Sequence, residues 1–137
     1  MKKMNNKGFS LVELIIVIAI MAVLMGVLAP QLLKYVEDSR AQTDLSAMSE
    51  IENATKIALS IEDIYNSVSD GTTVTIANGA QVASSDSLLQ AELLRTCPDA
   101  IKLTSKTWGS TGGTITINFD AAAGTFKLTN SWTTATP

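Results

Sequence analysis

The sequence predicts an α+β fold in which one long N-terminal α-helix packs on a small antiparallel β-sheet. Three observations predict it. An apolar run continues without a polar residue from Leu14 to Ala29, which makes the first half of the helix apolar on every side. In residues 31–69 the apolar positions recur mostly at steps of three and four, so the second half is amphipathic. After Gly71 the pattern changes to the period-two alternation of strands, interrupted by glycine-rich turns.

Composition limits what this chain of 137 residues can do. It contains no histidine, the commonest general base and metal ligand, and we expect no catalytic, cofactor or metal site. After Ala100 only Asp120 offers a carboxylate, which is too few for a calcium loop. The net charge is −3 and no basic patch follows the first eight residues, so direct nucleic-acid binding is not expected. Cys97 is interpreted as a small buried hydrophobe rather than a reactive or intermolecular thiol.

The first 30 residues are typical of a membrane-insertion signal. Three lysines precede the apolar run, and such charges stay on the cytoplasmic side while the following segment is sent outward. The segment Phe9–Ala29 would span about 31 Å as a helix at about 1.5 Å per residue, which matches a bilayer core. Gly26 and Pro30 are weak points in this helix, since proline removes a backbone hydrogen bond and clashes with the preceding turn.

Glu13 is the one charged residue inside this segment. A carboxylate in hydrocarbon costs on the order of 2.5–3.5 kcal/mol on insertion scales, so it needs a partner. No lysine or arginine follows it closely on the same helix. One interpretation is that Glu13 reaches the interface beside Lys7, and the other depends on where the chain is cut.

The stretch 8–13, GFSLVE, followed by the apolar run and Pro30, resembles the class III signal of type IV pilins and pseudopilins. The resemblance implies that a prepilin peptidase cuts between Gly8 and Phe9 and then methylates the new amine of Phe9. Glu13 falls at the acidic position of that family, and Pro30 falls where a helix-breaking proline is common. The close match covers about 30 residues, and beyond them the resemblance is only architectural.

The resemblance also implies a use for the buried acid. The amine of Phe9 on a neighbouring subunit would neutralise Glu13 if the helices stack in a staggered bundle, and this pairing would set the register of assembly. The helix around Gly26 and Pro30 would loosen when subunits pack. A simple kink at the membrane exit is the alternative interpretation of these two residues.

These observations divide the chain into four parts and predict their elements. Residues 1–8 would be a cleaved leader, 9–30 the transmembrane and filament-core helix, 31–70 the amphipathic half of the helix, and 71–137 a β-rich globular head. The helix would run from about residue 9 to 69, bent at Pro30. Its buried stripe would comprise Leu33, Val36, Leu45, Met48, Ile51, Ala54, Ala58, Ile61, Tyr65 and Val68. Asp44, Glu50 and Glu52 would lie off this stripe or on its solvated face.

Within the head, turn signals separate the expected elements. A two-residue hairpin turn at Asn78-Gly79 would join Thr72–Ala77 to Gln81–Ala83. A helix would begin at Ser87 with a Ser/Gln capping box and end near Arg95. Strands are expected at Ile101–Trp108, Thr114–Phe119 and Thr125–Trp132, separated by turns at Gly109–Gly113 and Ala121–Gly124. Their inner face would carry Ile115, Ile117, Phe119, Phe126 and Leu128, and the outer face would be rich in threonine.

The resemblance implies a structural subunit, not an enzyme, of an extracellular type IV pilus. Such a pilus serves adhesion, aggregation, twitching motility or DNA uptake. The implied partners are the prepilin peptidase, the assembly platform and its ATPase, the membrane before assembly, and further copies in a helical filament. The precursor would sit in the cytoplasmic membrane with its C-terminal domain outside. The alternatives are a pseudopilin of a type II secretion or competence system, and a membrane-tethered binding module or enzyme.

Overall fold

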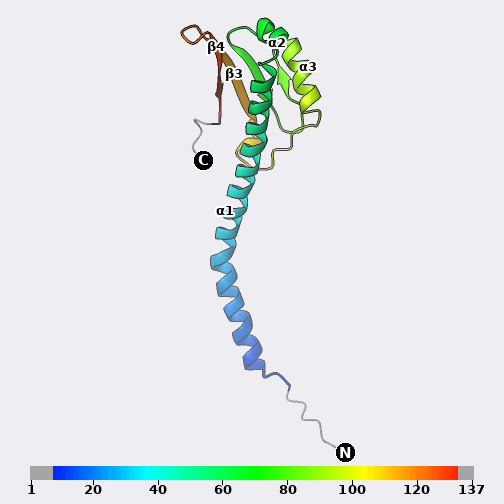
Figure 1. The fold of residues 1–137 in the computed structure, drawn as a ribbon. Helices are drawn as coiled ribbons and strands as arrows, with labels where there is room; N and C mark the ends of the chain where they lie inside the picture. The colour runs from blue at the N-terminus through cyan, green and yellow to red at the C-terminus, as the bar shows by residue number, and fades with distance from the viewer. Residues whose placement is uncertain (1–7, 133–137) are drawn as a thin grey trace, which may run out of the picture. The chain divides into compact units, whose positions relative to one another are not determined.

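The computed structural model describes residues 8–132 and confirms the α+β class (Figure 1). The elements are α1 (Leu11–Ala58), α2 (Glu62–Ser67), β1 (Thr72–Ile76), β2 (Ala83–Ser84), α3 (Ser87–Thr96), α4 (Trp108–Thr111), β3 (Gly113–Asp120) and β4 (Thr125–Asn130). The chain forms two compact units that divide between Val36 and Glu37.

The first unit is the apolar part of α1. Even the least exposed large apolar side chain between Leu11 and Leu33, that of Val17, is 47% exposed. The helix α1 continues through Gly26 and Pro30, although Pro30 has no N–H to donate to the preceding turn. The most apolar window of α1 has a mean hydropathy of 3.0, so its length and composition would allow it to cross a membrane. A signal sequence near an N-terminus has the same length and composition.

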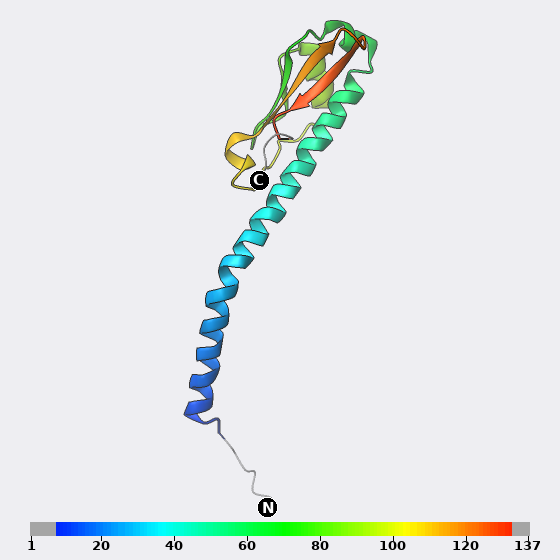
Figure 2. The ribbon, with the colours of Figure 1, turned by 90° about the vertical axis from the view of Figure 1, so that its left-hand side faces the viewer.

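The second unit packs the rest of α1 and α3 on a four-stranded antiparallel sheet with the order β2-β1-β3-β4. In Figure 2 the sheet lies in front of α3, so its outer face is turned toward the viewer. The fully buried side chains of the core include Met48, Ile76, Leu89, Leu93, Ile115 and Ile117. Burial of such a side chain contributes about 1.5–3 kcal/mol, and the core therefore holds this unit together.

The two C-terminal strands form where the alternation predicts them. β3 and β4 pair in antiparallel register, with Ile117 opposite Leu128 and Phe119 opposite Phe126. Ile117 is fully buried as expected, but Phe119 is 46% exposed. Phe119 lies near the end of β3, where the ring of Phe126 contacts it edge-on at 5.4 Å. The alternation correctly placed the Phe119 side chain on the same face as Phe126, but it wrongly predicted that Phe119 is buried.

The prediction of one helix to residue 69 is wrong, because α1 ends at Ala58. Both the N–H and the hydroxyl of Ser60 donate to the carbonyl of Ile57, at 3.0 and 2.6 Å, which closes a tight turn. A separate helix, α2, then begins at Glu62. The turn shifts the helical register, so Ile64 is buried and Ile61 is 38% exposed. Leu33 and Val36, also placed on the stripe, are exposed.

The prediction that Asp44 lies off the buried stripe is also wrong. This side chain is 1% exposed, and residues 60 and 61 positions later in the sequence bind it. The N–H of Thr104 donates to its two oxygens at 2.9 and 3.0 Å, and the N–H and hydroxyl of Ser105 donate at 2.8 and 2.6 Å. Burial by itself would raise the pKa of Asp44, but these hydrogen bonds outweigh it and hold the pKa below its ordinary value.

These bonds explain why residues 101–108 do not form the expected strand. The consecutive N–H groups of residues 104–106 all donate to carboxylates of α1. Those of Thr104 and Ser105 bind Asp44, and that of Lys106 binds Glu37. These donors therefore do not pair with a strand. The segment ends in the helical turn α4, which occupies most of the predicted turn 109–113 and buries Trp108.

The hairpin prediction is wrong in its detail. A turn does form at Asn78-Gly79, where the Ala80 N–H donates to the Ala77 carbonyl at 3.2 Å. The β1–β2 ladder, however, contains only the pairs Val74–Ser84 and Thr75–Ala83, several residues from this turn. The Gly79 N–H instead donates to the Ile101 carbonyl at 2.7 Å, and the Asn78 side chain accepts from the Leu103 N–H. The turn thus binds the 101–103 segment.

The helix α3 begins at the predicted residue but has a different cap. Its N-cap is Asp86, whose side chain accepts from the Leu89 N–H at 2.9 Å. The Gln90 side chain, expected in a capping box with Ser87, instead accepts from the Ser84 N–H and donates to the Val82 carbonyl. An aspartate directly before a helix is itself a strong N-cap, and it leaves the glutamine free to bind the strand.

Replacing Gly112 with alanine is expected to cost about 3 kcal/mol or more of unfolding free energy. Gly112 has a φ of +64°, and a Cβ there would lie 2.1 Å from the Ile76 carbonyl oxygen, a backbone atom that cannot rotate away. Gly124 is the matched control, because its φ of +65° is the same but its Cβ would meet nothing within 4 Å. Alanine there should cost only about 1–2 kcal/mol. Urea unfolding followed by tryptophan fluorescence measures the unfolding free energy of both variants. An equal loss of unfolding free energy in Gly112→Ala and Gly124→Ala would contradict the steric argument.

Candidate processing and assembly site

The N-terminal motif lies where the chain enters α1. Residues 8–10 precede the helix, which begins at Leu11. The Ser10 N–H donates to Oε2 of Glu13 at 2.8 Å, and the Leu14 N–H donates to the Ser10 carbonyl at 3.2 Å. This is the glutamate half of a capping box, in which the acid three residues into a helix binds the backbone of the N-cap.

The junction between Gly8 and Phe9 is accessible. Both residues are exposed and non-helical, and the Phe9 side chain is 93% exposed. A Cβ added at Gly8 would meet nothing within 4 Å, and its φ is not in the left-handed region. The folded chain therefore gives no reason for a glycine at this position. Any requirement for it comes from a molecule that binds the junction.

Glu13 has a partner that the sequence reasoning missed. Among the described residues its hydrogen bond is to the Ser10 backbone, and the two salt bridges there, Lys56–Glu52 and Arg95–Glu92, do not involve it. The S-x-x-E spacing of residues 10–13 was the signal that could have identified this cap. A backbone N–H satisfies one lone pair of the carboxylate and leaves its charge uncompensated. The acid can therefore still bind a cation from another chain.

The other predicted site residues lie along the same helix. Gly26 is exposed, and a Cβ there would meet nothing within 4 Å. Pro30 lies inside α1, whose helical assignment continues on both sides of it. Glycine and proline lower helix propensity by about 1 and 3 kcal/mol relative to alanine. Loosening of the helix on assembly remains a prediction.

In residues 8–132, no group of three or more His, Cys, Asp or Glu residues could hold a metal ion. Cys97 is half-buried and packs against the core. Burial, and then the charge of Glu50, raise the pKa of the Cys97 thiol, which disfavours the reactive thiolate. Glu52, expected to be solvated, binds Lys56 at 2.7 Å and the Asn130 amide at 2.6 Å.

Comparison with known proteins supports the sequence motif. Residues 3–29 match the family model of the prokaryotic N-terminal methylation motif, which confirms the resemblance at the N-terminus. Over 79 residues the chain is 39% identical to prepilin peptidase-dependent protein A of Clostridium perfringens (strain 13 / Type A). This match covers 56% of the chain and 55% of the relative, so the chain spans about half the length of that protein. No solved structure matches the chain.

Proposed function

We propose that this chain, which carries a prepilin-type N-terminus, is a structural subunit of an extracellular type IV pilus filament. The observation that carries the proposal is the first unit of the structure. A methylation motif there leads into a helix whose apolar side chains are all exposed and whose one acid lies near its start. A surface of this kind needs a cover, since exposed apolar area costs about 25 cal/mol per Å² in water.

The exposed apolar surface would be buried in two different ways, first in the membrane-bound precursor and then in the assembled filament. Lipid covers the apolar residues of the precursor, with the N-terminus inside and the second unit outside the cytoplasmic membrane. In the filament, the helices of other copies cover the same residues and exclude water equally well. One apolar surface therefore serves both as membrane anchor and as filament core.

Processing connects these stages. A prepilin peptidase, on which the clostridial relative depends by its name, would cut between Gly8 and Phe9 and methylate Phe9. The exposed, non-helical junction supports access by such an enzyme. The new amine and Glu13 would then pair between neighbouring subunits and set their register. An assembly platform and its ATPase would extract the subunits, and the finished pilus would act in adhesion, aggregation, twitching motility or DNA uptake.

The mature chain is expected to begin at N-methylated Phe9. Replacing Gly8 with valine should abolish this cut. The folded chain has room for a side chain at this position, so the requirement for glycine would come from the active site of the peptidase. Mass spectrometry of the N-terminal peptide from membranes and from sheared surface material measures both results. The matched control is Gly26→Ala, a change at another open glycine of the same segment, which should leave the cut intact.

The same experiment tests the alternatives. An intact leader on the mature wild-type chain would contradict the pilin proposal and favour a membrane-tethered binding module or enzyme. A correctly processed chain that is absent from sheared filaments, together with lost secretion or DNA uptake on deletion, would favour a pseudopilin of a secretion or competence system.

A further inference from the structure

The turn after β1 contains the one Asn-Gly pair of the chain, Asn78-Gly79, and both residues are exposed. An asparagine that precedes a glycine is especially prone to lose its side-chain amide without an enzyme, because glycine has no side chain that hinders attack by its own nitrogen. Water also reaches an exposed turn. The pair is therefore a chemically reactive position.

The reaction begins when the backbone nitrogen of Gly79 attacks Cγ of the Asn78 side chain. A bond forms between these two atoms, the bond from Cγ to Nδ2 breaks, and the proton of the Gly79 N–H leaves with Nδ2 as ammonia. Water then opens the resulting five-membered imide at one of its two carbonyl groups. The nitrogen regains a proton, and residue 78 becomes an aspartate or, with the main chain running through its side chain, an isoaspartate.

Both reacting groups are bound to other parts of the folded chain. The Gly79 N–H donates to the Ile101 carbonyl at 2.7 Å, so the nitrogen keeps the proton that the attack must remove. The Asn78 side chain accepts from the Leu103 N–H at 3.0 Å and donates to the Gly109 carbonyl at 3.2 Å, so the amide is not free to turn toward the attacking nitrogen. Since the turn is exposed, these hydrogen bonds rather than burial restrain the reaction.

All three binding partners of the turn belong to one segment, residues 101–109. The segment also donates to the turn, from the Ile101 N–H to the Ala80 carbonyl at 3.0 Å. Its middle is bound to α1, where Asp44 and Glu37 accept from its backbone N–H groups. Local opening of this segment would release the turn while the rest of the second unit stays folded.

We propose that Asn78 is a self-modification site, that the 101–109 segment keeps it unreacted, and that opening of this segment allows its deamidation. The change is irreversible. Both products lack the Nδ2 donor, and in the aspartate a second carboxylate oxygen would face the Gly109 carbonyl in place of the hydrogen bond of 3.2 Å. Two acceptors in such contact repel each other, so the segment would not close as before. None of these steps depends on whether the chain assembles into a filament.

The first experiment compares the folded and the unfolded full chain. The detergent-solubilised protein is kept at neutral pH with and without guanidinium chloride, and peptide mass spectrometry measures the fraction of aspartate and isoaspartate at residue 78 over time. The folded chain should react at Asn78 at least about tenfold more slowly than the unfolded chain. Equal rates in the two states would overturn the proposal.

The variant Glu37→Ala tests whether the 101–109 segment provides the protection. It removes the acceptor of the Lys106 N–H, which is one of the hydrogen bonds that hold the segment to α1. Loss of one such bond should make opening of the segment easier, and deamidation of Asn78 in the folded chain should become about threefold to tenfold faster. An unchanged rate would overturn the assignment of the protection to this segment.

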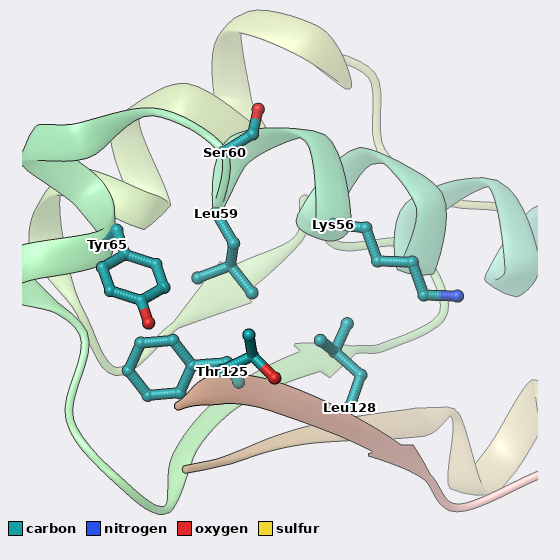
Figure 3. A pocket seen from close by; sticks show the side chains of 7 residues that line it. Lys56, Leu59, Ser60, Tyr65, Thr125 and Leu128 are labelled. Carbon is teal, nitrogen blue, oxygen red and sulfur yellow. The ribbon is translucent and has the colours of Figure 1, made fainter. Parts of the chain in front are cut away.

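Tyr65→Phe is the matched control. It also removes one hydrogen bond between a side chain and the backbone, the one from the Tyr65 hydroxyl to the Gly124 carbonyl at 3.0 Å. Figure 3 shows Tyr65 in a groove with Leu59 and Leu128, and none of the residues that line this groove belongs to the turn or to the 101–109 segment. Asn78 should react at the wild-type rate in this variant. An acceleration equal to that in Glu37→Ala would assign the protection to overall stability and overturn the local mechanism.

The variant Asn78→Asp tests whether the segment can close after the reaction. It carries the aspartate product from the start, so it should unfold at a lower urea concentration than the wild type, because the new carboxylate opposes the Gly109 carbonyl. Asn53→Asp makes the same change at an exposed position of α1 and should leave the unfolding midpoint unchanged. A wild-type midpoint in Asn78→Asp would overturn the proposed irreversible change.

Discussion

Replacing Glu13 with alanine is expected to abolish filament assembly and to leave the chain in the membrane. Removal of a carboxylate from an apolar segment lowers the insertion cost by up to about 2.5–3.5 kcal/mol, so membrane retention should be equal or better. Assembly should fail because the Phe9 amine of a neighbouring subunit would lose its partner and remain as an uncompensated charge among packed helices. The measurement is the amount of subunit in sheared surface filaments relative to the amount in membranes.

The variant Glu13→Gln separates the two roles of this side chain. Glutamine can still accept the hydrogen bond that the Ser10 N–H now donates at 2.8 Å, but it carries no charge. Failure of both variants would assign assembly to the charge. Normal filaments from Glu13→Gln would contradict the charge-pairing role and assign assembly to the helix cap. Normal filaments from Glu13→Ala would contradict both.

Replacing Asp44 with alanine is expected to lower the unfolding free energy of the second unit by about 3 kcal/mol or more. The change leaves the N–H groups of Thr104 and Ser105 and the Ser105 hydroxyl without their acceptor. Each buried donor left unsatisfied costs about 1–3 kcal/mol. Urea unfolding of the detergent-solubilised full chain, followed by the fluorescence of Trp108 and Trp132, measures the loss, because both tryptophans are buried.

The contribution of Asp44 to the unfolding free energy should also depend on pH, and it should decrease in acid. Its pKa in the folded chain lies below the ordinary value of 3.8, so the unfolded chain binds the proton more tightly. The stabilisation is therefore complete above about pH 4–5 and is lost as the pH falls through the lowered pKa. The difference in stability between wild type and Asp44→Ala should be constant near neutral pH and should shrink in acid.

Asp38→Ala is the matched control for both measurements. Asp38 lies on the same helix, also in the second unit, and is exposed. Its replacement should change the unfolding free energy by no more than about 0.5 kcal/mol. A loss as large as that of Asp44→Ala would show that any negative charge on this helix matters. A difference from wild type that does not change in acid would contradict the assignment of the stabilisation to the ionised carboxylate.

Features that depend on neighbouring residues were predicted well. The order of charge, glycine, phenylalanine and apolar run in residues 3–29 is a linear signal, and the matching family model confirms it. The strands β3 and β4 were also predicted, because alternation of side chains along an extended chain reports directly which face is buried. The roles assigned to Gly8, Phe9 and Glu13 remain predictions, since they concern other molecules.

Features that depend on distant residues were predicted poorly. Asp44 was expected on the outside of the helix because it falls off the apolar stripe, yet its donors lie 60 and 61 positions away in the sequence. The same donors prevented the strand expected at 101–108. The end of α1 at Ala58 was missed because the helical pattern continues in sequence while the Ser60 turn shifts its register.

The sequence alone therefore determined the prepilin-type N-terminus, the apolar helix and the class of the fold, because each is encoded in the order and spacing of polar and apolar residues. Only the tertiary structure decided that Asp44 is buried, that residues 101–108 form no strand, and that Gln90 binds the outer edge of β2. These three depend on which backbone groups meet after folding. Every residue carries the same backbone donors and acceptors, so their pairing leaves no mark in the pattern of side chains.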